Sequence, residues 1–364
     1  MADIACQDGR IVEIGALAGR AVAGREILCE GRVVTAGLVD AHIHLDKALL
    51  GARAPSRLGT VTEAIRVTGE AKRGFTREDI ADRARRVLDM AVRQGTTAMR
   101  SHVEVDPMIG LMGFEALLRD ALRMGADLVG GVPYNDTDAH RHIAIVFDLA
   151  AEFGVDVDFH VDFFDEPQHL HALHIAEETV RRGWQGRVAL GHMSEMAALP
   201  PDEQDRVAHV LARAGVAVIV LPATDLYLMG RKDVRAIRRG IAPVKRLLAA
   251  GVTVAAATNN VRNAFTPLGT AGLPLMGYLL GVAAHMGADP ELRQALDMLT
   301  LHPARILRLP DHGLAVGGRA DLVIWEAERA EDVVAALAPV RLVVKAGRVS
   351  IEHARSVAEP WREP

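Results

Sequence analysis

One pattern recurs through the middle of this chain of 364 residues and restricts what it can fold into. A glycine ends a helical stretch, a short apolar run follows, and the run stops on polar residues. Glycine is a common residue after a last helical turn, because it adopts the left-handed conformation without steric cost. Near-continuous apolar strands separated by helices predict a parallel sheet that is covered on both faces. The runs that follow such a glycine span residues 96–103, 127–132, 155–159, 187–190, 216–221 and 252–257.

A further apolar strand precedes these six and ends on Ala-His-Ile-His, with His42 and His44 two residues apart. Successive strand side chains alternate between faces, so both imidazoles fall on one side, close enough to share a metal ion. Taken alone, the pair is equally compatible with two polar residues on a solvated face. Counting this strand, the pattern predicts seven parallel strands.

The two ends of the chain differ from its middle. Residues 1–35 and 313–364 contain short alternating stretches broken by glycine, which is typical of small antiparallel strands. We therefore expect one small β-sandwich domain built from both termini and a βα domain over residues 36–312. Within the latter, Thr76-Arg-Glu-Asp79 predicts a helix start, because Thr can cap the helix and a 3.6-period apolar stripe follows.

Composition excludes several classes of protein. The net charge of −5 leaves no basic field to attract nucleic acid or anionic lipid. The two cysteines are too few for a disulfide framework or a thiolate metal site, so a reduced, cytoplasmic setting is expected. The N-terminus has no signal-peptide pattern. The apolar run 271–287 falls short of the roughly 20 residues that a spanning helix needs, which predicts a buried helix.

Several motifs in order along the chain resemble the cytosine deaminase branch of the amidohydrolase superfamily. The resemblance implies a TIM-like barrel with a small β-sandwich. It also implies one divalent metal ion, zinc or iron, and hydrolysis of C–N bonds in cyclic amidines and amides. The matching motifs are Val34-Thr-Ala-Gly-Leu-Val-Asp-Ala-His-Ile-His-Leu-Asp-Lys47, Arg100-Ser-His-Val-Glu-Val-Asp106, Gly130-Gly-Val-Pro-Tyr134, Val157-Asp-Phe-His160, Leu190-Gly-His192, Thr258-Asn-Asn260 with Pro267-Leu-Gly, and His302-Pro-Ala-Arg305 with Gly317-Gly-Arg-Ala-Asp-Leu-Val-Ile324.

Carried over residue by residue, the resemblance makes His42, His44 and His160 the metal ligands. His192 would position the attacking water or the leaving group. Three neutral imidazoles leave an open position on the ion, where a bound water is acidified toward about pH 7. Tyr134 or Asn135 stands where two-metal members keep a bridging lysine, which favours a single ion.

Two substitutions depart from the branch. The third metal histidine of relatives begins a His-x-x-Glu motif whose glutamate transfers protons, but this chain has Phe163 at that place. The last strand of relatives ends on an aspartate that ligates the metal and deprotonates water, and here Asn259 or Asn260 replaces it. An amide oxygen can contact a cation, but it cannot accept a proton at neutral pH.

A third departure is a missing unit. Relatives carry a further helix and strand, roughly 30 residues, ahead of Leu117, and that strand ends on a glutamine that binds substrate. In this chain the helix 111–124 is the single expected connection between the strands that end at Glu104 and Tyr134. The resemblance thus agrees with a barrel of seven strands, one βα unit short.

We therefore expect a metal-dependent hydrolase of a small nitrogen heterocycle or cyclic amide, with altered proton-transfer residues. The alternative is a metal-binding barrel that no longer hydrolyses, acting as a lyase, an isomerase or a binding protein. A small molecule is the expected partner, and a homo-oligomer is an open possibility. The expected catalytic residues are His192 and Asp162. Asn259 is expected to join His42, His44 and His160 at the metal, and the expected substrate contacts are His102, Glu104, Tyr134, Asn135, Phe163 and Asn260.

Overall fold

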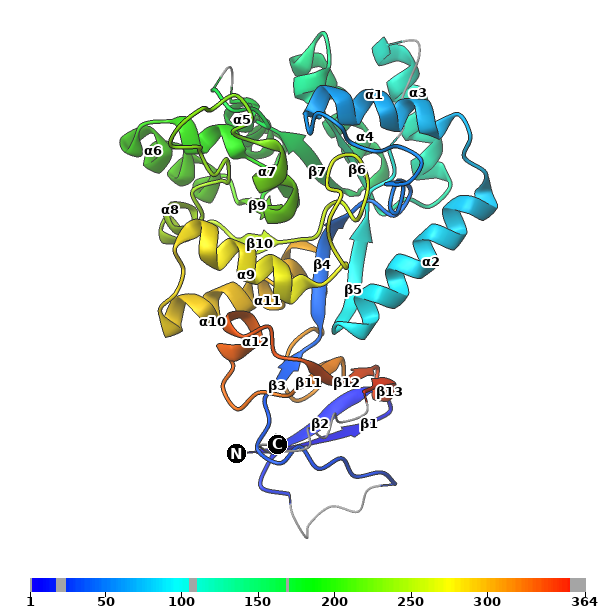
Figure 1. The fold of residues 1–364 in the computed structure, drawn as a ribbon, viewed down its shortest axis with the longest axis vertical. Helices are drawn as coiled ribbons and strands as arrows, with labels where there is room; N and C mark the ends of the chain where they lie inside the picture. Colours follow the sequence, from blue (N-terminus) through cyan, green and yellow to red (C-terminus); the bar gives the residue numbers. More distant parts are fainter. Residues whose placement is uncertain (1, 18–23, 105–109, 168–169, 354–364) are drawn as a thin grey trace, which may run out of the picture.

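A computed structural model of the chain describes residues 2–17, 24–104, 110–167 and 170–353. The parallel strands lie in two sheets, β4 beside β5 and β6 to β10 in sequence order. Figure 1 shows them surrounded by helices. The strands are β4 (Leu38–Ile43), β5 (Thr96–Ser101), β6 (Leu128–Gly131), β7 (Asp156–Val161), β8 (Val188–His192), β9 (Val216–Val220) and β10 (Val254–Ala256).

The end of β10 returns to the first parallel strand. Ile43 forms a parallel bridge with Asn259, whose backbone N–H donates to the His42 carbonyl at 2.8 Å. In turn, the His44 N–H donates to the Asn259 carbonyl at 2.9 Å. The two sheets are thereby joined into a curved wall. On its other side, β5 and β6 share no ladder among the described residues, which leave out 105–109.

Helices connect and cover the parallel strands. Thr76 caps α2 as its sequence predicts, since its hydroxyl accepts the Asp79 N–H at 3.2 Å. The helices are α1 (Val61–Lys72), α2 (Arg77–Arg93), α3 (Gly110–Arg123), α4 (Ala139–Phe153), α5 (His171–Arg182), α6 (Pro201–Arg213), α7 (Pro222–Leu228), α8 (Val244–Ala249), α9 (Leu273–Ala284), α10 (Asp289–Asp297), α11 (Leu301–Ile306), α12 (Asp332–Ala335) and the 3₁₀ turns η1 (Pro133–Asn135) and η2 (Ser194–Ala198).

The apolar run 271–287 forms α9, a helix of 12 residues with one side buried against the core. Across the described residues, the structure contains no helix with the length and apolar character needed to cross a bilayer. The main core lies between the parallel sheet and its helices, with Phe147, Phe159, Leu190 and Leu211 fully or almost fully buried. Small side chains such as Ala41, Ala189 and Ala255 pack on the opposite face of the strands.

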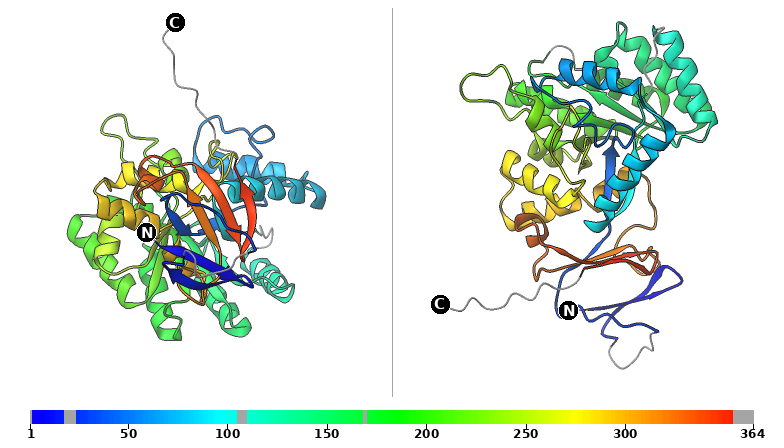
Figure 2. Two further views of the ribbon diagram at one scale, coloured as in Figure 1. Left: turned by 90° about the horizontal axis from the view of Figure 1, so that it is seen from below. Right: turned by 45° about the vertical axis from the view of Figure 1, so that its right-hand side comes forward.

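Strands from both ends of the chain lie together below the parallel strands (Figure 1, Figure 2). A four-stranded antiparallel sheet has the order β13-β12-β11-β3, and β1 and β2 form a separate hairpin. A bridge between Arg10 and Arg319 links the hairpin to the segment before β11. These strands are β1 (Asp3–Gln7), β2 (Arg10–Gly15), β3 (Val34–Ala36), β11 (Leu322–Trp325), β12 (Val340–Lys345) and β13 (Arg348–Glu352).

Gly37 alone separates β3 of the small sheet from β4 of the parallel wall. Its N–H donates to the Asp321 carbonyl at 2.8 Å. A Cβ at this position would lie 2.1 Å from Oγ1 of Thr97, so only glycine fits between the two parts. β4 is fully buried along its length. The strand that delivers His42 is therefore held at both ends.

Candidate active site

Three histidines from two parallel strands converge where those strands end. His42 lies in β4, His44 directly after it, and His160 in β7. Nε2 of His160 lies 2.9 Å from Nε2 of His42 and 3.1 Å from Nε2 of His44. These ligand atoms all lie within 4.8 Å of one another, a spacing that suits a single metal ion. The alternation that placed both imidazoles of His-Ile-His on one side is consistent with this geometry.

The three imidazoles are suited to bind a cation because they are held neutral. Burial, together with the neighbouring His102, lowers the pKa of His42 to about 3. Burial also lowers the pKa of His44 and of His160 well below the ordinary value. The three Nε2 atoms lie close together, yet each neutral imidazole carries only one proton for its two ring nitrogens. A divalent ion fits this donor set.

A carboxylate lies on the far side of each imidazole of the His42–His44 pair. Nδ1 of His42 is 3.6 Å from Oδ1 of Asp158, and Nδ1 of His44 is 3.8 Å from Oε1 of Glu104. Such partners commonly fix which imidazole nitrogen faces a metal. Asp158 is fully buried and forms an ion pair with Arg100. Although burial raises the pKa of Asp158, Arg100 holds it well below its ordinary value.

His102 and Glu104, expected at the substrate, are placed close to the metal histidines. The ring of His102 stacks on that of His42 with centroids 3.9 Å apart. Its Nε2 lies 3.4 Å from Oδ1 of Asp158. Glu104 pairs with Lys47 and, at 3.0 Å, with Lys72. Both residues thus contact charged or aromatic groups of the protein itself.

His192, at the end of β8, has a carboxylate partner of its own. Its Nδ1 lies 2.7 Å from Oδ1 of Asp225, and both side chains are buried. The phenyl ring of Phe163 packs on the imidazole with centroids 3.9 Å apart. The ring of His192 lies 5.6 Å from that of His160 between centroids. His192 therefore lies next to His42, His44 and His160 but does not belong to the group that could share a metal ion.

Asp162 caps the start of helix α5. Its carboxylate accepts the backbone N–H groups of His171 at 2.9 Å and Ala172 at 3.2 Å, at the start of α5. It is fully buried and has a positive φ of 52°. These contacts orient the carboxylate toward the helix end, which is a favourable place for a negative charge.

The two asparagines after β10 differ in their contacts. Oδ1 of Asn259 is buried and has no hydrogen-bond partner among the described residues. Oδ1 of Asn260 accepts from Nδ2 of Asn263 at 2.8 Å and helps to shape the following loop. An orphaned amide oxygen next to the histidine strand is compatible with a contact to a cation.

An apolar cluster forms the wall beside His192. Phe163, Leu228 and Met229 are its buried members, and Tyr134 packs against them with Val61, Tyr227 and Phe265. The rings of Tyr134 and Phe163 lie 6.5 Å apart between centroids. Asn135, next to Tyr134 in η1, is exposed. Tyr134 and Phe163 therefore lie close together, whereas Asn135 faces solvent.

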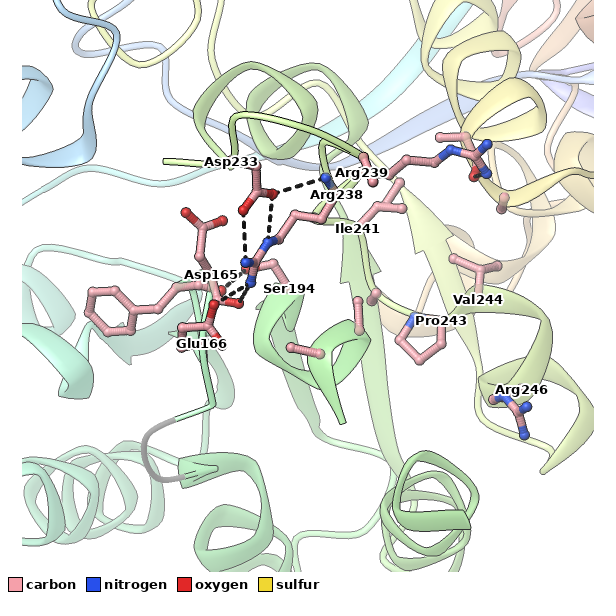
Figure 3. A pocket seen from close by; sticks show the side chains of 18 of the residues that line it. Asp165, Glu166, Ser194, Asp233, Arg238, Arg239, Ile241, Pro243, Val244 and Arg246 are labelled. Atoms are coloured by element: carbon pink, nitrogen blue, oxygen red, sulfur yellow. Dashed lines mark hydrogen bonds and ion pairs between the residues drawn. The ribbon is translucent and has the colours of Figure 1, made fainter. Parts of the chain in front are cut away.

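A cavity of about 790 Å³ lies next to this cluster, lined by the loop after β7, by η2 and by residues 233–246 (Figure 3). Arg238 occupies one side and pairs with Asp233 at 2.8 Å and with Glu166 at 2.7 Å. It also donates to the Asp165 carbonyl. The charges in this part of the cavity are largely paired with one another.

Sequence reasoning missed the roles of Asp158, Arg100 and Asp225. A signal for the first was present, because Asp158 precedes His160 by two residues and so shares its strand face. Arg100 and His102 are related in the same way. Nothing local marks Asp225 as the partner of His192, because the two residues are 33 positions apart in the sequence, one in α7 and the other at the end of β8.

Comparisons with known proteins place these residues in a family context. The sequence pattern described as the amidohydrolase family matches residues 78–351. A pterin deaminase of Rhizobium rhizogenes is 28% identical over 96% of this chain and 87% of its own length. An N-isopropylammelide isopropyl amidohydrolase of Pseudomonas sp. (strain ADP) is 26% identical, covering 98% and 95%. The crystal structure of 5-methylcytosine deaminase from Klebsiella pneumoniae with 5-fluorocytosine superposes with a TM-score of 0.93 at 27% identity, covering 98% of this chain and 96% of the other.

Proposed function

Because the chain belongs to the amidohydrolase family, we propose that it is a metal-dependent hydrolase of C–N bonds in a small nitrogen heterocycle, cyclic amide or amidine. The observation that carries this proposal is the convergence of the Nε2 atoms of His42, His44 and His160. The names of the relatives support the substrate class, since a pterin, N-isopropylammelide and 5-methylcytosine are all nitrogen heterocycles.

We propose that one divalent ion, zinc or iron, is held by the three histidines, with Oδ1 of Asn259 as a further neutral contact. Such an ion supplies Lewis acidity to a water molecule and to the substrate. Asn259 contributes no charge, so the site holds the ion through neutral donors. With no carboxylate among the proposed ligands, the open position on the ion is left to water or substrate.

Proton transfer falls to His192 in this proposal. A histidine is able to accept and return a proton near neutral pH, whereas Phe163 and Asn259 cannot. His192 would accept a proton from the attacking water as its oxygen bonds to the ring carbon. It would then deliver that proton to the nitrogen as the C–N bond breaks. Water and substrate thus give a free amine or ammonia and a hydroxy heterocycle, which becomes the carbonyl product when the second hydrogen of the water moves to a ring nitrogen.

The apolar wall narrows the substrate class further. Phe163 is 2% exposed and forms, with Leu228 and Met229, an apolar surface beside His192. An apolar wall favours a less polar ring or an N-alkyl leaving group over cytosine, because a polar amino group buried there loses its hydrogen bonds to water. We therefore expect weak activity on cytosine itself.

The architecture forms part of the proposal. We propose that β4 to β10 make a barrel of seven strands, one βα unit short, with its gap between β5 and β6. The barrel would span residues 36–312. The β-sandwich would take residues 1–35 and 313–364, of which 1, 18–23 and 354–364 lie outside the described residues.

Metal content tests the proposal first. Protein purified without chelator and supplied with zinc or iron should contain about one ion per chain by elemental analysis. The His42→Ala/His44→Ala double variant should contain none. His209→Asn is the control, because His209 is an exposed residue of α6 that bonds the Asp205 carbonyl. An unaltered protein without metal would end the metallohydrolase assignment.

Kinetics test the substrate class. Metal-loaded protein should hydrolyse N-alkyl-substituted amino heterocycles faster than cytosine, and His192→Asn should lower kcat by roughly 100-fold or more. Cytosine turnover as fast as that of the N-alkyl compounds would contradict the role given to the apolar wall. Full activity of His192→Asn would contradict the role given to His192.

A further inference from the structure

His192 is fixed from two directions. Its Nδ1 lies 2.7 Å from Oδ1 of Asp225, well inside the range of a charge-assisted hydrogen bond. The face of its ring is covered by Phe163 at 3.9 Å between centroids. An imidazole held at one nitrogen and along one face keeps a single ring orientation. Its Nε2 is then the nitrogen left for the substrate side.

The backbone at the end of β8 is built to hold this orientation. His192 and Met193 both have positive φ, 76° and 61°, which side chains other than glycine rarely adopt. Strain of this kind persists only where the surroundings enforce it, and it clusters at functional sites. Here the surroundings include the Asp225 bond and a hydrogen bond from the Met193 N–H to the Val161 carbonyl at 3.2 Å.

Asp225 is itself held in place. It lies in the first turn of α7, is fully buried, and its second oxygen accepts the Leu221 N–H at 3.3 Å. Burial raises the pKa of Asp225, while the neighbouring His192 opposes the rise. The groups around it include Tyr134, whose pKa is raised by burial and by the charges of Asp225 and Glu195. A buried carboxylate destabilises the fold if it loses its charged or hydrogen-bonded partner, so the pairing of Asp225 with His192 is favoured.

Resting on the proposed function, we infer that Asp225 is a positioning residue that holds His192 as the Nδ1–H tautomer and directs its Nε2 to the reacting atoms. The chain lacks a carboxylate at positions 163 and 259. Asp225, bonded to Nδ1 of His192, therefore provides the negative charge next to the group that transfers the proton. It stabilises the imidazolium that forms when Nε2 takes the proton. Asp162 cannot do this, because its oxygens are bonded at the start of α5.

The first test reads the tautomer directly in metal-free protein. In ¹⁵N–¹H spectra of histidine-labelled protein above the pH at which His192 is protonated, Nδ1 of His192 should carry the proton. In Asp225→Asn the amide N–H can donate to Nδ1, so the proton should move to Nε2. A wild-type His192 protonated on Nε2 would overturn the inference, and this measurement needs no variant to fold.

The second test is kinetic. Asp225→Asn should lower kcat by roughly 10³- to 10⁴-fold, as reversal of a tautomer does in serine proteases, and should leave KM within a few-fold. Asp225→Glu should recover part of the loss, because it restores the charge. Asp321→Asn is the matched control, a buried aspartate of the small sheet bonded to Lys345, and should leave kcat unchanged.

The two readouts separate this inference from the proposed function. If no heterocycle is hydrolysed, the proposed function fails while the tautomer still decides the role of Asp225. If hydrolysis is observed and Asp225→Asn retains kcat, the inference fails and the hydrolase assignment stands. Loss of activity in Asp225→Asn with the tautomer unchanged would also contradict the inference, because it would show a merely structural role.

Discussion

At the scale of single residues, the site depends on carboxylates behind imidazoles as much as on the imidazoles. Strand alternation in the sequence was enough to predict that His42 and His44 share one side. It could not predict that Asp158 pairs with Arg100, because the two residues are 58 positions apart in the sequence and lie on different strands, β7 and β5. Such pairs are determined by tertiary packing, which a single sequence does not display.

Asp158→Asn should weaken metal binding by roughly 10- to 100-fold, the usual cost of losing a partner of a metal-binding histidine. The substitution keeps the shape of the side chain but removes the charge that orients His42. Competition with a chromophoric chelator measures the affinity. Asp156→Asn is the control, since Asp156 lies on the same strand and pairs with Arg187 and Arg308 near the protein surface. Equal affinity in both variants would show that Asp158 serves only Arg100.

Asn259→Asp should raise metal affinity by about tenfold or more, because a carboxylate adds charge where a neutral oxygen now lies buried and unpartnered. The same chelator competition gives the result, and Asn260→Asp serves for comparison because its oxygen is bonded to Asn263. A fall in affinity for Asn259→Asp alone would place that side chain away from the ion.

At the scale of elements, five of the six glycines that the sequence marks as helix stops follow a helix end, whereas α5 ends at Gly183 and Gly186 lies in the turn after it. All six have positive φ, between 61° at Gly215 and 99° at Gly125. Each precedes one of the strands β5 to β10. Four strands, β5, β6, β9 and β10, are shorter than their apolar runs, and β10 keeps only Val254–Ala256 of the run 252–257. Apolar content reports burial, whereas strand bounds depend on where a neighbour supplies hydrogen bonds.

Helix α5 carries a pH-dependent contribution to stability. Hydrogen bonds from Arg181 and Arg182 lower the pKa of Glu178 to about 2. A carboxylate with a lowered pKa stabilises the fold fully above its unfolded pKa, near 4.5, and loses that contribution as pH falls toward 2. Glu178→Gln should therefore cost no more than about 1 kcal/mol at pH 7, and less at pH 4.

Urea unfolding at pH 7, 5 and 4 checks this prediction. Glu177→Gln is the control on the same helix, since that side chain is 80% exposed. A difference between wild type and Glu178→Gln that grows toward acid pH would contradict the assignment.

The segment from Gly230 to Arg238 is tied to the loop that carries Phe163. The Gly230 N–H donates to Asp165 at 2.7 Å, and Arg238 reaches Glu166 and the Asp165 carbonyl (Figure 3). Arg238→Met should release this tie and increase tryptic cleavage of the segment after Arg231, Lys232 or Arg235 several-fold. Metal content should be unchanged, because no metal histidine is contacted.

Arg246→Met is the matched control for limited proteolysis, since Arg246 lines the same cavity but pairs with Asp205. Equal cleavage of the two variants would show that Arg238 does not hold the segment.

At the scale of the whole molecule, the sequence was enough to predict a βα region between short strands at both termini. It could not reveal how closely the two parts are joined at Gly37. Gly37→Ala should destabilise the protein by about 1–3 kcal/mol, because the added Cβ overlaps the side chain of Thr97. Thermal or urea unfolding measures the loss. Gly15→Ala is the control, since its Cβ would meet nothing within 4 Å, and equal effects would contradict the close approach.

The continuity of β3, Gly37 and β4 has a consequence during protein synthesis. β3 belongs to the same sheet as β11, and Nε1 of Trp325 donates to Oγ1 of Thr35 at 2.9 Å across 290 residues. Ribosomes add about 5–20 residues per second, so β3, which precedes the strand bearing His42, waits roughly 15–60 seconds for its partner strand β11. The sheet that holds one end of the histidine-bearing strand is therefore completed long after that strand has been made, whereas β5, the neighbour of that strand in the parallel wall, follows much sooner.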